Sequence, residues 1–326
     1  MIGRATERNP TVQDVQAARQ RISAAVRWTP LERSDYLSER CGADVLLKLE
    51  CWQRTRSFKV RGAFNALGTL PAGDRSRGVV TASAGNHGQA VALAARAHDV
   101  PATIFVPANA PQIKQQRIRQ LGAALNLDAP DYDEAERLAF EFAAQEGRPF
   151  VHAFSDAAVI AGQGTVGLEI IDDAPQVRDV IVPVGGGGLI AGVGLVLKAM
   201  QPHVRVIGVQ SVETRAMYEA FRAGRVTDVP ITPTLADGLA GCTDETAYGL
   251  ARGVVDDIVL VEEQAIAHAI ATLYARDGIV AEGAAATAVA AVLGGNVQLR
   301  GPAVLVVTGG NIDGAILAGI LRRGHE

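Results

Sequence analysis

The stretch VIVPVGGGGLIAGVGLVLKAM, residues 180–200, is the most apolar in the chain and says most about its fold. Four consecutive glycines and then Lys198 interrupt it, which argues against a membrane span. We interpret it as a buried strand, a glycine loop and a helix that begins near Leu189. Four glycines are more than a turn needs, and they allow the backbone to surround a phosphate at the positive end of the helix. A merely flexible loop is the alternative.

The same alternation of short aliphatic runs and longer Ala-rich helical patterns continues on both sides of this stretch. Strands are expected at 44–49, 78–81, 102–106, 124–126, 179–183, 204–209, 257–261 and 303–307. Helices are expected at 12–21, 61–69, 87–98, 111–121, 132–146, 162–171, 189–200, 216–222, 262–277 and 284–293. This order predicts parallel sheets covered by helices, which is an α/β fold.

Composition excludes several classes of protein. The 326 residues carry a net charge of −4 with no Lys/Arg run, so nucleic acid is not an expected partner. The polar first residues have no apolar core of the kind a secretory signal needs. Three scattered cysteines, Cys41, Cys51 and Cys242, form no CxxC motif, so we expect reduced thiols and a cytoplasmic protein. Little chain follows the last expected strand, so no C-terminal regulatory domain is expected.

Lys59 stands out among the four lysines of the sequence. It lies in SFKVRG, residues 57–62, between an aromatic and a β-branched residue at a loop-to-helix transition. A lysine that loses its hydration shell becomes a nucleophilic amine suited to Schiff-base chemistry. A surface lysine at a helix start is the alternative, which the hexapeptide alone does not exclude.

Two further loops follow expected strands. TASAGNHG, residues 81–88, contains small residues that allow backbone N–H groups to face a carboxylate, although a plain strand-to-helix connection with a Ser or Asn cap is equally compatible. VTGGN, residues 307–311, places the hydroxyl of Thr308 at a strand end, where it either contacts a ligand nitrogen or only caps the strand.

Together and in this order, SFKVRGA, SAGNHGQA, GGGGL and TGGN resemble the fold-type II (tryptophan synthase β-like) pyridoxal 5'-phosphate (PLP) enzymes. The closest likeness is to the threonine/serine dehydratase (ammonia-lyase) and serine racemase group, nearer the dehydratases. LLKLE, VIAGQGT, LADGLA and VAEGAA extend the likeness over nearly the whole chain. The resemblance implies two three-layer α/β/α domains with mostly parallel sheets. Residues 1–74 plus 152–326 would form a large cofactor-binding domain, and residues 75–151 a small domain carrying the substrate loop.

The resemblance also implies roles for individual residues. Lys59 would hold PLP and act as the catalytic base at Cα, and Thr308 would face the pyridine nitrogen. Phe58 would flank the cofactor ring, although a core aromatic is an equally good interpretation. The other implied cofactor contacts are Asn86, Gly185, Gly186, Gly187, Gly188 and Leu189. The implied substrate contacts are Ser83, Ala84, Gly85, Asn86 and His87.

Two departures from the group's pattern refine the function. Racemases of the group have a serine where this chain has Ala84, and racemisation needs a second acid/base across the Cα plane. Many members of the group bind a divalent cation through two carboxylates. This chain has Gln210 and Ala216 at those two positions, so no metal is expected. Glu282 is expected either near the cofactor or as an ordinary carboxylate at a helix start.

The resulting prediction is α,β-elimination of water from L-threonine, L-serine or both, giving a 2-oxo acid and ammonia. The alternatives are a dehydratase of another β-hydroxy amino acid such as 3-hydroxyaspartate, a serine racemase, a β-replacement synthase, and a non-catalytic binding protein on the same fold. The expected partner is a small amino-acid substrate, and no membrane contact is expected. The chain is expected to form a homodimer or homotetramer.

Overall fold

The computed structural model describes residues 8–230 and 232–323. The described chain divides into two compact units. Unit 1 comprises the described residues up to Arg27 together with Lys59–Gln163, and unit 2 comprises Trp28–Phe58 together with the described residues from Gly164 onward. The expected division placed the described residues up to 27, and residues 59–74 and 152–163, in the large domain. These residues group with unit 1 because α3 (Lys59–Thr69) is hydrogen-bonded to other residues of that unit. The side chain of Asn65, on α3, donates to the Ala158 carbonyl at 2.7 Å.

Unit 2 is built on a mostly parallel sheet with the strand order β1-β2-β9-β6-β7-β8 among the described residues. Its strands are β1 (Leu31–Arg33), β2 (Val45–Lys48), β6 (Asp179–Pro183), β7 (Arg205–Ser211), β8 (Asp257–Val261) and β9 (Ala303–Val306). Only β1 runs antiparallel within this described sheet. The expected strands of this part of the chain are confirmed, and β1 is an addition to them.

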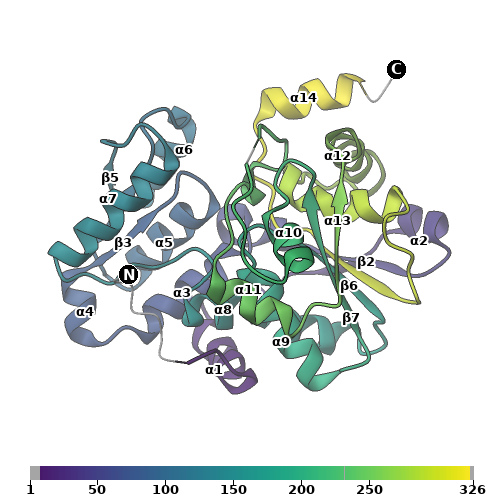
Figure 1. Ribbon diagram of the computed structural model, residues 1–326, viewed down its shortest axis with the longest axis horizontal. Helices are drawn as coiled ribbons and strands as arrows, with labels where there is room; N and C mark the ends of the chain where they lie inside the picture. Colours follow the sequence, from purple (N-terminus) through teal and green to yellow (C-terminus); the bar gives the residue numbers. More distant parts are fainter. Residues whose placement is uncertain (1–7, 231, 324–326) are drawn as a thin grey trace. The chain divides into compact units, whose positions relative to one another are not determined.

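Alternate residues of these strands face two separate cores, as the period of two requires. Ile181 belongs to one core, which is completed by helices α2 (Asp35–Cys41), α12 (Glu263–Asp277), α13 (Gly283–Leu293) and α14 (Gly314–Arg323). Val180 and Val182 belong to the other, completed by helices α8 (Ala157–Asp173, from Gly164 on), α9 (Gly188–Met200), α10 (Ala216–Ala223) and α11 (Glu245–Arg252). Figure 1 shows α12 and α13 on one side of the strands and α9 on the other. Unit 2 therefore has the predicted three layers.

Unit 1 repeats this arrangement on a smaller sheet. Its described strands β3 (Val79–Ala82), β4 (Ala102–Phe105) and β5 (Ala124–Asn126) are parallel and lie in sequence order. One face packs on helices α1 (Val12–Ile22), α3, α5 (Asn86–Ala97) and α6 (Gln112–Gln120). The other packs on α7 (Tyr132–Gln145), and α4 (Ala72–Arg77) precedes β3.

A search of the described helices for membrane-spanning segments found none with the necessary length and apolar character.

Candidate active site

Three predicted site segments of unit 2 lie at one edge of its sheet. The glycine loop follows β6, Thr308 follows β9, and Phe58 follows β2 after two short 3₁₀ turns, Glu50–Trp52 and Arg54–Arg56. β2, β9 and β6 are parallel neighbours, so their carboxyl ends meet at the same edge. Ligands of open α/β sheets bind outside the carboxyl ends of the strands. The sequence-predicted residues of unit 2 are therefore brought together where a ligand is expected.

The glycine loop has the geometry of an anion cup. Gly187 precedes α9 with a φ of +105°, in the left-handed region where side chains are disfavoured. A Cβ at this position would also lie 2.5 Å from Cε of Met217. Within the described chain, no hydrogen-bond acceptor is found for the backbone N–H groups of residues 185–189. Such N–H groups at a positive helix end favour a phosphate, so the loop fits the phosphate group of the predicted cofactor.

The segment just before Lys59 is fixed on the residues that follow β9. Thr55 and Arg56 have φ values of 54° and 56°, an unusual left-handed conformation for residues other than glycine. The backbone N–H of Phe58 donates to the Thr308 carbonyl at 3.1 Å, and the side chain of Asn311 donates to the Thr55 carbonyl at 2.7 Å. These bonds hold a strained segment, of the kind that often occurs at functional sites.

Thr308 is buried, with 3% of its surface exposed, and no described residue hydrogen-bonds to its hydroxyl. Phe58 is partly buried and packs against the core that contains Leu189, so the core interpretation of this aromatic has direct structural support. Glu282 directly precedes α13, and its carboxylate accepts the backbone N–H of Asn311 at 3.1 Å. The Glu282 carboxylate therefore lies at the end of β9, near the backbone of the TGGN segment.

Lys59 is the first residue of α3 in unit 1, and its side chain is half-buried. Its Nζ donates to the Ala153 carbonyl at 3.0 Å. The start of α3 is held by α8, because the side chain of Gln163 accepts the Gly62 N–H at 3.2 Å. The VIAGQGT motif thus acts as a support for the helix that carries the predicted catalytic lysine.

The predicted substrate loop joins β3 to α5. The hydroxyl of Ser83 accepts the Gly85 N–H at 3.1 Å, so this N–H is already bonded and is not a free carboxylate contact. Asn86 begins α5, and Ala84, two residues before it, is half-buried. A Cβ at Gly88 would lie 2.3 Å from the Ser83 carbonyl oxygen, so this glycine is needed for the tight turn.

His87 is buried in unit 1 and is held neutral. Burial lowers its pKa to about 3, with the positive charge of Lys59 as a second cause. Its Nε2 lies 3.0 Å from the Val151 carbonyl, to which a neutral ring donates, while the buried Nδ1 has no hydrogen-bond partner. Lys59 and His87 are thus close enough to interact electrostatically.

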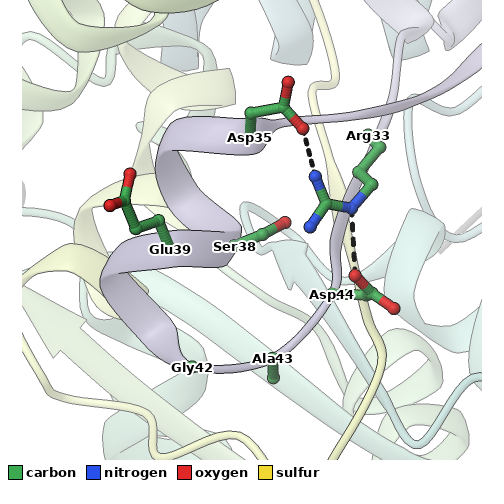
Figure 2. Close-up of a pocket in the computed structure, with 7 residues that line it drawn as sticks. All are labelled: Arg33, Asp35, Ser38, Glu39, Gly42, Ala43 and Asp44. Atoms are coloured by element: carbon green, nitrogen blue, oxygen red, sulfur yellow. Dashed lines mark hydrogen bonds and ion pairs between the residues drawn. The ribbon is translucent and has the colours of Figure 1, made fainter.

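Two other polar regions of unit 2 lie elsewhere. A surface pocket is lined by Arg33, Asp35, Ser38, Glu39, Gly42, Ala43 and Asp44, and none of the predicted site residues lines it (Figure 2). Its arginine is paired with the carboxylates of Asp35 and Asp44. We therefore do not assign the active site to this pocket.

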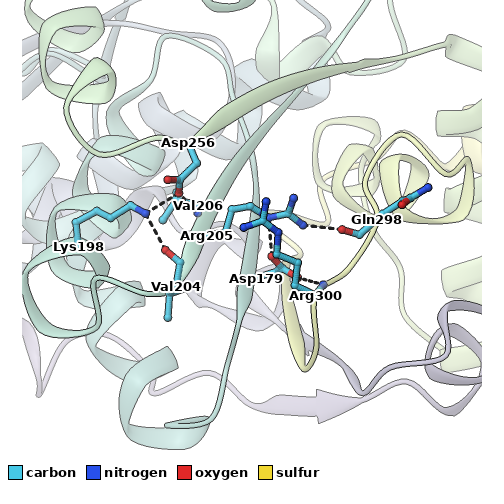
Figure 3. Close-up of polar contacts among 8 residues, drawn as sticks. All are labelled: Asp179, Lys198, Val204, Arg205, Val206, Asp256, Gln298 and Arg300. Atoms are coloured by element: carbon cyan, nitrogen blue, oxygen red, sulfur yellow. Dashed lines mark hydrogen bonds and ion pairs between the residues drawn. The ribbon is translucent and has the colours of Figure 1, made fainter.

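The second region lies at the amino end of β6, β7 and β8 (Figure 3). Lys198 is paired with Asp256 at 2.6 Å, and Asp179 with Arg205 at 2.7 Å.

Lys48, on β2, is fully buried and paired with Glu169 at 2.7 Å. Lys48 and Lys198 therefore have structural partners, which supports Lys59 as the lysine of interest.

Sequence reasoning missed two residues that contact the glycine loop. Gln210 was considered only as a position without a metal ligand, yet its side chain donates to the Val184 carbonyl. Thr243 was not considered, and its hydroxyl donates to the Gly186 carbonyl. The available signal for Thr243 was a hydroxyl directly after LADGLAGC.

The described residues contain no group of three or more His, Cys, Asp or Glu side chains placed to hold a metal ion.

Comparison with known proteins identifies close relatives. A family model described as pyridoxal-phosphate dependent enzyme matches residues 22–309. An L-threonine ammonia-lyase of Thermotoga maritima is 45% identical over 96% of this chain and 79% of that protein. The catabolic L-threonine dehydratase TdcB of Escherichia coli is 41% identical over 93% of both chains.

Two solved structures are similar over nearly the whole chain. Maize serine racemase has a TM-score of 0.92 and 31% identity, covering 98% of this chain and 100% of that one. A processed threonine deaminase isoform 2 from Solanum lycopersicum has a TM-score of 0.91 and 32% identity, covering 99% and 92%. These structures share a fold across two reactions, so the fold does not choose between them.

Proposed function

Because the chain belongs to the family of pyridoxal-phosphate dependent enzymes, we propose that it is a PLP-dependent L-threonine dehydratase (ammonia-lyase). It would remove water from L-threonine, and L-serine as a second substrate, to give a 2-oxo acid and ammonia. PLP dependence and the fold-type II α/β architecture are confirmed by the family match. The proposed reaction is supported above all by the 45% identity to an L-threonine ammonia-lyase over 96% of the chain.

The residues of the chain fit the demands of this reaction. PLP, when bound, delocalises the electron pair that remains on Cα after its proton is removed. We assign the covalent attachment of PLP and the removal of the Cα proton to the amine of Lys59. We assign the phosphate to the N–H groups of Gly185 to Leu189, which lack acceptors among the described residues.

Two neutral side chains are assigned to the cofactor ring. The hydroxyl of Thr308 would hydrogen-bond the pyridine nitrogen without protonating it, because a hydroxyl carries no negative charge to stabilise a proton there. Asn86 would contact the phenolic oxygen. The substrate carboxylate is assigned to the loop Ser83–His87, in which the N–H of Gly85 already donates to the Ser83 hydroxyl.

Serine racemisation is the second candidate, because maize serine racemase has a TM-score of 0.92 to this structure. Ala84 argues against it. A methyl group neither gives nor accepts a proton, so the chain offers no second acid/base at this position. The two bacterial relatives named for threonine are also more similar in sequence, at 41–45% identity, than maize serine racemase, at 31%.

The test begins with cofactor attachment. Purified protein loaded with PLP is reduced with borohydride, digested and analysed by mass spectrometry. We expect the label on Lys59 and none on Lys48, Lys114 or Lys198. The variant K59R keeps the positive charge and serves as the matched control, in which no peptide is labelled. A label on another lysine would overturn the assignment.

Turnover is then measured as 2-oxo acid and ammonia from L-threonine, L-serine and 3-hydroxyaspartate, with chiral analysis of the recovered serine. We expect threonine to have the highest kcat/KM and K59R to lose at least roughly 10²–10⁴-fold in kcat. Faster release from hydroxyaspartate would move the proposal to the alternative dehydratase. Rapid formation of D-serine would show that the Ala84 argument is wrong.

The cytoplasmic location and the homodimer or homotetramer expected from the sequence remain proposals. Sedimentation of the PLP-loaded protein tests the assembly, and a monomer at working concentration would contradict it. Fractionation of the producing cells tests the location.

A further inference from the structure

The carbonyl groups of the glycine loop are held by donors from other parts of unit 2. The Val184 carbonyl accepts from the side-chain amide of Gln210 at 3.1 Å, and the Gly186 carbonyl accepts from the hydroxyl of Thr243 at 3.2 Å. The Gly187 carbonyl accepts the N–H of Ala191 at 3.0 Å in the first turn of α9. Three carbonyls of one short loop are therefore fixed in direction.

Fixing a carbonyl also fixes the N–H of the same peptide group. The peptide unit is planar and trans, so its C=O and N–H point in opposite directions. No cis peptide occurs in the described residues. The N–H groups of Gly185, Gly187 and Gly188 must therefore point away from Gln210, Thr243 and the body of α9. These three are among the N–H groups of residues 185–189 for which the described chain supplies no acceptor.

The two side-chain donors are themselves well ordered by their surroundings. Gln210 is fully buried on β7, and its Oε1 accepts the backbone N–H of Tyr218 in α10 at 2.8 Å. Thr243 is 6% exposed, and its hydroxyl lies 3.9 Å from the sulfur of Met217. Met217 also lies against the loop, 2.5 Å from the position of a Cβ on Gly187. An amide is required at 210, because it must accept on one side and donate on the other.

We propose that Gln210 and Thr243 are positioning residues that preorganise the phosphate cup by turning its peptide carbonyls away from the cofactor. This inference rests on the proposed function, in which the glycine loop binds the PLP phosphate. The donors act through the loop and do not touch the cofactor. Their removal leaves the peptide groups of the loop free to rotate, so the N–H groups must be ordered again on each binding event.

The experiment compares PLP with pyridoxal, which has the same aldehyde and ring but no phosphate. Cofactor-free protein is titrated with each compound, and the dissociation constants are taken from the visible absorption of the bound form. T243V removes the hydroxyl at nearly constant shape, and T243S restores it. Q210E keeps the acceptor for Tyr218 and removes the donor to Val184. T287V is the matched control, because the buried Thr287 hydroxyl donates to the Ala284 carbonyl at 2.9 Å, away from the loop.

We expect T243V and Q210E each to raise the dissociation constant of PLP roughly three- to tenfold, the range for one lost hydrogen bond. Their dissociation constants for pyridoxal should change less than about twofold. T243S should bind PLP as the wild type does, and T287V should leave the ratio of the two constants unchanged. Thermal unfolding of each cofactor-free variant identifies any variant that has lost its fold.

Three results would count against the inference in different ways. A wild-type protein that prefers PLP to pyridoxal, with the same preference in folded T243V and Q210E, would overturn the positioning role alone. A wild-type protein that binds both compounds equally would overturn the assignment of the phosphate to the glycine loop, and the positioning role with it. Equal weakening of PLP and pyridoxal in the variants would show a general structural role.

Discussion

His87 shows how a single residue of the predicted substrate loop affects stability. Burial lowers its pKa to about 3 in the native protein, against about 6.5 in an unfolded chain. Between these two values the unfolded state binds more protons than the native state. The free energy of unfolding therefore falls as the pH falls from about 6.5 toward 3, by up to about 1.4 kcal/mol per pH unit from this residue.

We expect H87Q to remove this part of the pH dependence, because glutamine retains a donor for the Val151 carbonyl and does not titrate. Urea unfolding of the cofactor-free protein at several pH values from 7 to 4 measures the effect. H268Q, which changes an exposed histidine on α12, is the matched control and should follow the wild type. An H87Q profile as steep as the wild-type profile would contradict the burial of a neutral imidazole.

At the scale of elements, α3 and α8 approach closely at a pair of glycines in unit 1. A Cβ at Gly162 would lie 2.5 Å from the Arg61 carbonyl oxygen and 2.6 Å from Cα of Gly62. Both neighbours are backbone atoms, so a side chain at this point forces the two helices apart. This contact lies within a turn of Lys59 and fixes the start of its helix.

We expect G162A to lower the free energy of unfolding by about 1–3 kcal/mol, the usual cost of overpacking. It should also lower kcat for threonine, because the start of α3 moves. G249A is the matched control: it lies in the helix α11 with nothing within 4 Å of the added Cβ. It should be neutral or stabilise by up to about 1 kcal/mol, since alanine has the higher helix propensity. Equal stability of G162A and wild type would show that the contact is looser than described.

The sequence predicted the bounds of several strands and helices well and missed other elements entirely. β5, β6 and β8 have the expected bounds, and α12 begins one residue later than expected. β1 was missed because Leu31–Arg33 is a short, partly polar edge strand without a clear apolar alternation. α14 was missed because Gly314 and Gly319 are weak helix formers in a segment with little chain beyond it.

At the scale of the whole molecule, the motifs predicted which residues gather at the carboxyl edge of the unit 2 sheet. The parallel pairing of β2, β9 and β6 is what joins Phe58, Thr308 and the glycine loop. Gln210 and Thr243 were outside this prediction, because their hydrogen bonds go to carbonyls far away in the sequence. A hydroxyl or an amide in a single sequence, such as the hydroxyl after LADGLAGC, does not show which distant carbonyl it bonds.

The opposite, amino edge of the same sheet has a structural role, which leads to a separate prediction. Asp179 is fully buried and accepts from Arg205 at 2.7 Å and from the Arg300 N–H at 2.6 Å. In D179N an amide NH₂ replaces one of the two accepting oxygens and faces another N–H donor. We therefore expect the free energy of unfolding to fall by about 1–3 kcal/mol. The PLP dissociation constant should stay within about twofold of wild type, because β6 separates Asp179 from Pro183 by roughly 13 Å. Urea unfolding and cofactor titration measure the two effects, with the exposed D228N as control. Weaker PLP binding by folded D179N, without lost stability, would contradict this division between the two edges.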